Sequence, residues 1–309
     1  MGDYVHSWSG EASQWECDEL GHLNMRRYMF KIAEARQMLA ILLGLTDSFK
    51  KGAYSTLKMR EFHIRYLGEV RPGGPISIKS AITDLRETQM DVVHVMSHPD
   101  GRAACMVHET LSHISLRTFE DFLWPSRLRE AAGPFTIDVP DITGSKGLNL
   151  TSSPSGLTEA QVKDMGMQRI GRGVFAPGDA NIFRRVTAQA ILARVTQTVG
   201  QFSAAWPEMF SSDFVSGKSH IHGALLEARV VLGPAATPGD GYNFYSGIAG
   251  ATPNVRTLIH KLYNCVTCEL IASMEGVGCL MDLNARNHMK TPADTVAALN
   301  SAAIDGLKI

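Results

Sequence analysis

The spacing of apolar residues changes along the chain and marks its predicted helices and strands. From Met25 to Leu43, apolar side chains recur every three or four residues, which predicts a helix. Asn24 is a favourable N-cap, and Gly44 is a favourable residue just past the last turn. The last two turns, MLAILLG, are apolar on nearly every side, and this pattern predicts a buried helix.

Alternation of apolar and polar residues predicts strands on both sides of this helix. One strand is predicted within residues 5–18, and four more follow the helix. Turn sequences such as RPGGP and PDG separate the later strands, which indicates an antiparallel meander. These four strands are predicted at 54–68, 76–85, 89–98 and 102–116.

The order strand, helix, four strands recurs in the second half, which indicates an internal duplication. Residues 173–200 resemble 15–44, and the second predicted helix ends at Gly200. We predict an N-terminal repeat over 1–118, a linker over 119–165 and a C-terminal repeat over 166–309. The linker is rich in Gly, Pro, Ser and Thr and contains one short helix, and the chain ends in another short helix.

An antiparallel sheet with one apolar face must cover that face, and an apolar helix must be buried on all sides. Both conditions are met when each sheet wraps around its own helix. The predicted fold class is therefore α+β, with two antiparallel sheets that each wrap around a long buried helix.

Composition excludes several functional classes. The chain has 309 residues, a formal net charge of −1 and no basic run, so we expect no nucleic-acid partner. No apolar stretch reaches the ~18 residues of a membrane span, and we expect no membrane partner. The first sixteen residues lack the basic and apolar regions of a secretory signal, and the five cysteines are odd in number. These features favour a cytoplasmic protein with reduced thiols.

Two short patterns raise the question of a metal site. Cys265 and Cys268 form a CxxC, but a zinc site needs four ligands and no second pair completes it. His220 and His222 lie two apart on a predicted strand, so their side chains point the same way. No third ligand is linked to them by spacing, and we expect neither a metal nor another cofactor.

The stretch ECDELGHLNMRRY, residues 16–28, places an acid, an imidazole and an amide directly before the first helix. It resembles the start of hotdog-fold acyl thioesterases. In 4-hydroxybenzoyl-CoA thioesterase-like enzymes, the catalytic Asp stands three residues before a Gly, as Asp18 stands before Gly21. In plant acyl-ACP thioesterases the run reads Asp-x-Asn-x-His-x-Asn and then Tyr. Asp18, His22, Asn24 and Tyr28 match this run, whereas Leu20 departs from it.

The resemblance implies a tandem double hotdog that hydrolyses acyl-CoA or acyl-ACP to a free acid and a thiol. The residues fit this chemistry. Asp18 can serve as nucleophile or general base, and His22 can orient it or a water molecule. Free N–H groups at the helix start, on Met25 and the two following arginines, suit a thioester oxygen. Gly21 permits close approach of the substrate, while Asn24 caps the helix or binds water, and Tyr28 lines the acyl pocket or packs.

The second half departs from this motif. The alignment places Gly178-Asp179-Ala180-Asn181 opposite Gly21-His22-Leu23-Asn24, with Val174 or Phe175 opposite Asp18. Neither apolar residue can attack or accept a proton, so we expect one Asp-centred site. Asp179 and Asn181 remain secondary substrate-binding candidates, because sites in this fold form between the halves.

Two rival functions stay open. The chain could be a hotdog dehydratase or hydratase, or it could bind an acyl thioester without turning it over. Neither acyl-chain length nor homo-oligomer formation follows from the sequence.

Overall fold

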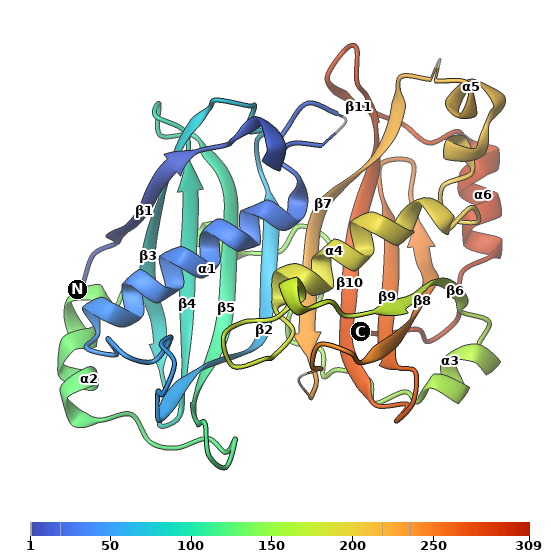
Figure 1. The fold of residues 1–309 in the computed structure, drawn as a ribbon. Helices are drawn as coiled ribbons and strands as arrows, with labels where there is room; N and C mark the ends of the chain where they lie inside the picture. Colours follow the sequence, from blue (N-terminus) through green and yellow to red (C-terminus); the bar gives the residue numbers. More distant parts are fainter. Residues whose placement is uncertain (1, 19, 218, 235) are drawn as a thin grey trace. The chain divides into compact units, whose positions relative to one another are not determined.

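The computed structural model describes residues 2–18, 20–217, 219–234 and 236–309. The chain divides into two compact units, which are described one at a time (Figure 1). The first comprises the residues up to Gly144 together with Asn181–Phe183, and the second comprises Ser145–Ala180 and Arg184–Ile309. Within the described residues, no helix has the length and apolar character needed to cross a bilayer.

The first unit is an antiparallel sheet with strand order β1-β3-β4-β5-β2. Alternating side chains give each strand one apolar face, and the apolar faces meet in the core. The four strands after the helix follow the predicted segments to within two residues at each end, because their turn sequences fix where each strand stops. Their bounds are β1 Val5–Glu11, β2 Ser55–Tyr66, β3 Pro75–Leu85, β4 Gln89–Ser97 and β5 Ala103–Ser115.

Helix α1, Met25–Leu42, lies on this sheet and contacts β1 and β3 (Figure 1). Both predicted ends are confirmed. The Asn24 side chain accepts a hydrogen bond from the Arg26 N–H, and Gly44 has φ +84°, the left-handed conformation that ends many helices. The expectation of burial on nearly every side is wrong for α1. Its inner side chains are buried, but Met38, Ile41, Leu42 and Phe30 are 42–45% exposed.

The second unit repeats this architecture with strand order β7-β10-β9-β8-β6, and a short β11 pairs with β10. Read from the other edge, the order is β6-β8-β9-β10-β7, in which the strands take the places of β1, β3, β4, β5 and β2 of the first unit. The duplication inferred from the sequence is therefore visible in the topology. The bounds are β6 Gln168–Val174, β7 Ile221–Leu232, β8 Gly241–Ala251, β9 Arg256–Asn264, β10 Leu270–Asp282 and β11 Asn287–Met289.

Helix α4, Ala188–Thr198, is the counterpart of α1 and contacts β6. Its N-cap is Thr187, whose side chain accepts a hydrogen bond from the Ala190 N–H. The alignment that places Asn181 opposite the N-cap Asn24 is wrong, because six residues lie between Asn181 and the start of α4. Eight of its eleven residues are buried, so α4 is shorter and more completely enclosed than α1.

The predicted linker is packed at both ends rather than loose. The predicted short helix is present as α2, Ser126–Ala132, where Leu128 packs with Trp124 and Leu39 in the core of the first unit. Helix α3, Glu159–Asp164, places Val162 against Tyr245 in the second unit. Two more short helices belong to the second unit: α5 Ser212–Val215 and α6 Ala293–Ser301, the predicted C-terminal helix. The repeat limits at 118 and 165 stay a prediction.

Candidate functional site

Asp18 lies in a closed loop between a 3₁₀ turn, Gln14–Glu16, and α1. A bridge between Cys17 and Leu23 joins the two ends of the loop. The Asp18 N–H donates to the His22 carbonyl at 3.0 Å, and the Gly21 N–H donates to the Asp18 carbonyl at 3.0 Å. Gly21 has φ +77°, a conformation that side chains other than glycine adopt only at a cost. This glycine turns the chain back and brings His22 over Asp18.

The structure brings the two predicted reactive side chains together. Asp18 Oδ1 lies 3.5 Å from His22 Nδ1 and accepts a hydrogen bond from the Leu20 N–H at 3.0 Å. The Asp18 side chain is 15% exposed and that of His22 is 22% exposed. A carboxylate held by a backbone N–H beside an imidazole, with part of its surface open, can act on a bound molecule.

The start of α1 offers fewer free donors than the sequence predicts. Asn24 Oδ1 accepts from the Arg26 N–H at 3.2 Å, and the Asn24 carbonyl accepts from the Arg27 N–H at 2.8 Å. These two N–H groups are therefore engaged, which corrects the expectation that both are available. The Met25 N–H has no acceptor within the described part of the chain. It is the donor of the first turn that remains for a ligand.

Tyr28 packs beneath the loop, with only 4% of its surface exposed. Its ring meets the Tyr66 ring edge to face at 5.2 Å, and the Tyr66 hydroxyl donates to the Met25 carbonyl at 3.2 Å. Burial, together with smaller effects that include the nearby Asp18, raises the pKa of Tyr28. The phenol therefore stays neutral, and its position supports the packing role.

Two neighbours of Asp18 in sequence are structural. Burial and the charges of Asp18 and Glu16 raise the pKa of the Cys17 thiol, so this cysteine is no thiolate at neutral pH. The Glu16 carboxylate accepts from Lys31 Nζ at 2.8 Å, and both side chains are less than 10% exposed. This buried ion pair joins the 3₁₀ turn before the loop to the second turn of α1.

A loop of the same kind precedes α4, and its geometry corrects the sequence alignment. Ala180 and Val186 form a bridge as Cys17 and Leu23 do, with the same number of residues between them and the following helix. Residue for residue, the equivalent of Asp18 is Asn181, and the equivalent of Gly21 is Arg184, which also has positive φ, +58°. Asn24 corresponds to Thr187, so Val174 and Phe175 do not lie opposite Asp18.

This register explains what Asp179 and Asn181 do. Asp179 corresponds to Glu16: it accepts from the Ala176 N–H at 2.7 Å and pairs with Arg194 of α4, just as Glu16 pairs with Lys31. The Arg194 guanidinium also lies over the Phe175 ring at 5.4 Å. Asn181 Oδ1 accepts from the Phe183 N–H at 3.0 Å. Asp179 is therefore engaged in holding its own loop against α4.

Sequence reasoning missed a buried polar network in the first unit. The hydroxyls of Ser7 and Ser80 lie 2.6 Å apart, and Ser80 Oγ lies 2.6 Å from His94 Nδ1. His94 Nε2 lies 3.1 Å from Glu109 Oε1, and both Glu109 oxygens accept from Arg36 of α1. The order serine, imidazole, carboxylate resembles a nucleophilic triad, but none of these three side chains is more than 1% exposed. The network is therefore a core feature that anchors α1.

The charges in this network set its ionisation. Burial alone would raise the pKa of Glu109, but Arg36 and His94 outweigh that effect and hold the pKa of this carboxyl at about 2. The second unit keeps one link of the network, because Ser246 Oγ lies 2.5 Å from His260 Nδ1. Burial lowers the pKa of His260 to about 4.

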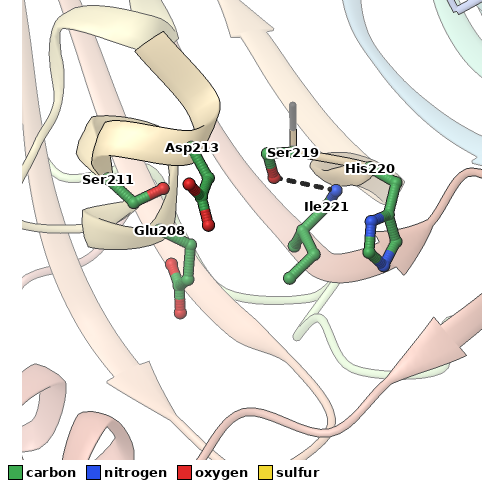
Figure 2. A pocket seen from close by; sticks show the side chains of 6 residues that line it. All are labelled: Glu208, Ser211, Asp213, Ser219, His220 and Ile221. Carbon is green, nitrogen blue, oxygen red and sulfur yellow. Dashed lines mark hydrogen bonds between the residues drawn. The ribbon is translucent and has the colours of Figure 1, made fainter. Parts of the chain in front are cut away.

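A shallow pocket of about 270 Å³ lies in the second unit (Figure 2). Six residues line it: Glu208, Ser211, Asp213, Ser219, His220 and Ile221. Figure 2 shows the two carboxylates beside the helical segment and His220 across from them. The Glu208 carboxylate is neutralised by the Arg256 guanidinium, and His220 lies 3.5 Å from Asp282. The predicted catalytic residues do not line this pocket.

The histidines and cysteines considered as metal ligands do not converge on a common site. His220 faces Asp282, whereas the His222 ring lies 5.0 Å from the Phe214 ring. Across residues 2–18, 20–217, 219–234 and 236–309, no three His, Cys, Asp or Glu side chains are placed to hold an ion. Cys268 is exposed and Cys265 is partly exposed, and both are reduced.

Comparison with known proteins bears on the segment that contains Asp18. Residues 12–132 match the sequence profile of the thioesterase-like superfamily. Over 132 residues, the chain is 24% identical to an Agrobacterium fabrum protein named L-carnitine dehydrogenase/betainyl-CoA thioesterase. That match covers 41% of this chain and 27% of the relative's length. The chain therefore spans about a quarter of the relative's length.

Solved structures match nearly the whole chain. An acyl-ACP thioesterase from Bacteroides thetaiotaomicron superposes with a TM-score of 0.63 at 12% identity, covering 88% of this chain and 96% of that one. The 12:0-ACP thioesterase from Umbellularia californica superposes with a TM-score of 0.64 at 14% identity, covering 88% and 92%. At these identities the likeness shows a shared fold. Together with the profile match, it confirms the resemblance inferred from residues 16–28.

Proposed function

We propose that this chain, whose residues 12–132 match the thioesterase-like superfamily, hydrolyses an acyl thioester of CoA or acyl carrier protein. The products are a free acid and a thiol. The observation that carries the proposal is the Asp18 carboxylate, held 3.5 Å from His22 before α1 and inside the matched segment. The relative is named for a CoA thioester, and the two superposed structures are named as acyl-ACP thioesterases.

Asp18 supplies the attack on the thioester carbonyl by one of two routes. As a nucleophile, its oxygen bonds to the carbonyl carbon, the carbon–sulfur bond breaks, and water then hydrolyses the resulting anhydride. As a general base, it takes a proton from water, and the water oxygen bonds to the same carbon. In both routes the sulfur leaves as a thiolate that takes up a proton. His22 orients the carboxylate, which is why the two lie side by side.

The first turn of α1 stabilises the charge that develops on the carbonyl oxygen. The Met25 N–H is the donor for this purpose, because Asn24 engages the next two N–H groups. One such donor is typically worth ~3 kcal/mol of barrier. Asn24 caps the start of the helix. Gly21 leaves room for the substrate, because it has no side chain and no atom beyond its chain neighbours lies within 4 Å of the position that a Cβ would occupy.

The proposal assigns catalysis to the first repeat alone. We infer that both are hotdog units, each with a sheet wrapped around its helix, α1 or α4. The second loop has an amide, Asn181, where the first has Asp18, and an amide neither attacks a thioester nor accepts a proton from water. One Asp-centred site per chain follows. Asp179 forms an ion pair with Arg194 and stabilises the second loop.

Thiol release from a panel of acyl-CoAs and acyl-ACPs tests the function, with wild type and Asp18→Ala compared. We expect at least one thioester to be hydrolysed and Asp18→Ala to lower the rate at least ~100-fold. Asp47→Ala is the matched control, since Asp47 is an exposed carboxylate of the same unit. Unchanged turnover in Asp18→Ala would overturn the site, and binding without hydrolysis would favour the non-catalytic rival.

Turnover in ¹⁸O-water tests for the nucleophilic route, because only that route can place the label in Asp18. A single turnover with excess enzyme places label in the product acid if Asp18 is a general base. If Asp18 is the nucleophile, water attacking the Asp18 side of the anhydride leaves the label in the carboxylate of Asp18. Mass spectrometry of the peptide that contains residue 18 then detects it.

A further inference from the structure

Three side chains beside the Asp18 loop form a stacked cluster. The Arg27 guanidinium lies over the Trp15 ring at 4.9 Å and over the Phe30 ring at 5.3 Å. Trp15 is 71% exposed and Phe30 is 43% exposed, so one face of each ring is available. We name these residues the Trp15 cluster. The rings hold the guanidinium in place and leave its N–H edges open to a ligand.

Arg27 has no carboxylate partner among the residues that the structure describes. The acids on the same elements are engaged elsewhere: Glu16 pairs with Lys31, and Glu34 accepts a hydrogen bond from Trp8 Nε1. A half-buried guanidinium that is stacked but not neutralised favours an anion. The positive end of the α1 dipole adds to this preference, because Arg27 is in the first turn.

The second repeat shows that the fold does not need this cluster. In the register fixed by the two loops, Gly178 stands at the position of Trp15, Ala190 at that of Arg27 and Ala193 at that of Phe30. The second loop and α4 form without the three large side chains. The cluster and the Asp18 carboxylate therefore occur together in the first repeat and are both absent from the second.

We propose that the Trp15 cluster binds the nucleotide end of coenzyme A, with adenine on the Trp15 ring and a phosphate on Arg27. Stacking on an exposed aromatic ring and bidentate contact from an arginine are the interactions that recognise a base and a phosphate. A phosphopantetheine arm on a carrier protein has no adenine. The proposal therefore makes CoA the carrier of this protein's substrate.

The cluster lies close along the chain to the carboxylate that is proposed to react. Trp15 is three residues before Asp18, so their Cα atoms are at most about 11 Å apart. Their side chains extend this reach. The inference deepens the proposed function and rests on it for the reaction, but binding of CoA is measurable without turnover.

Calorimetric titration with CoA, 3′-dephospho-CoA and pantetheine tests the proposal. For Arg27→Gln we expect the Kd of CoA to rise at least about tenfold, with pantetheine binding unchanged. Trp15→Ala should raise it about five- to 100-fold, and Trp15→Phe should restore most of the affinity because it keeps a stacking face. Arg117→Gln, an exposed arginine of the same unit, is the matched control. Thermal midpoints show whether each variant is folded.

The outcomes separate this inference from the proposed function. Equal affinity of folded wild type and Arg27→Gln for CoA would overturn it, as would equal affinity for CoA and pantetheine in wild type. Hydrolysis of acyl-ACP that falls in Arg27→Gln while CoA fails to bind would assign the cluster to a carrier protein instead. If CoA binds through the cluster but no thioester is hydrolysed, the inference stands and the proposed function fails.

Discussion

Replacing Glu109 with glutamine removes the central charge of the network that anchors α1. The Glu109 carboxylate on β5 accepts from Arg36 at 2.6 and 2.7 Å, and its side chain is fully buried. Glutamine preserves the shape but not the charge, and it leaves the Arg36 guanidinium without its partner. We expect the first unit, and with it the helix that follows the Asp18 loop, to lose stability.

The size of the loss follows from the ionisation of Glu109. Its pKa is lowered from 4.5 to about 2 in the folded protein. Because the folded pKa is below the unfolded one, the stabilisation is fully present above pH 4.5 and disappears as the pH falls toward 2. The lowered pKa of Glu109 therefore contributes about 3 kcal/mol to the free energy of unfolding at pH 7 and about 1 kcal/mol at pH 3.

Urea unfolding followed by tryptophan fluorescence measures this difference. With a slope of about 1–3 kcal/mol per molar urea, Glu109→Gln should lower the midpoint at pH 7 by about 1 M or more. The gap between the variant and wild type should narrow by pH 3. Asp84→Asn is the control, because Asp84 pairs with Arg86 in an exposed bridge worth ~0–1 kcal/mol. A gap at pH 7 no larger than that of the control, or one that does not narrow in acid, refutes the reasoning.

Substitutions at three further positions test other parts of the structure. Burial lowers the pKa of His260 from 6.5 to about 4, so the unfolded chain binds more protons between these values, and stability decreases as the pH is lowered from 6.5 to 4. His260→Asn should flatten the slope of the urea midpoint between pH 6.5 and 4, and an unchanged slope contradicts this. Asn24→Ala should lower the unfolding free energy by ~1 kcal/mol while Asn24→Asp retains it, and equal losses would disprove the capping role. Asp179→Asn should lower the urea midpoint because it strips Arg194 of its partner, and an unchanged midpoint argues against that pair.

Local signals were sufficient to predict the helix and the later strands of the first repeat. Asn24 and Gly44 mark the ends of α1 because capping depends on residues within one turn of the helix end. Alternation and turn sequences located β2 to β5 because each turn fixes the strand on either side of it. Burial was less predictable: the outward residues Met38 and Ile41 are as apolar as the inward ones.

The alignment of the second loop with the first was wrong because it matched residue types instead of backbone geometry. Glycine and asparagine in "GDAN" suggested the positions of Gly21 and Asn24, yet the equivalent residues are Arg184 and Thr187. Arg184 adopts a positive φ as Gly21 does, and Thr187 caps its helix as Asn24 does, so different residues give the same backbone conformation. Only the paired bridges at the loop ends reveal this register, and they involve contacts that the sequence does not show.

The remaining features depend on contacts between distant segments. Arg36 and Glu109 are 73 residues apart, and their pairing follows from the order of strands in the sheet. The closeness of Asp18 and His22 was predictable from one short motif, whereas the Trp15 cluster was not. It joins the 3₁₀ turn to α1 across the loop, and aromatic residues at such spacing are usually core residues.

The most direct measurement of the central claim is kcat/KM of Asp18→Asn on the thioester that wild type hydrolyses fastest. Asparagine keeps the shape of the side chain and an oxygen that can accept from the Leu20 N–H, so the loop should stay folded, as circular dichroism and the thermal midpoint would verify. The account predicts a fall of at least ~100-fold. A folded Asp18→Asn protein with the activity of wild type would contradict it.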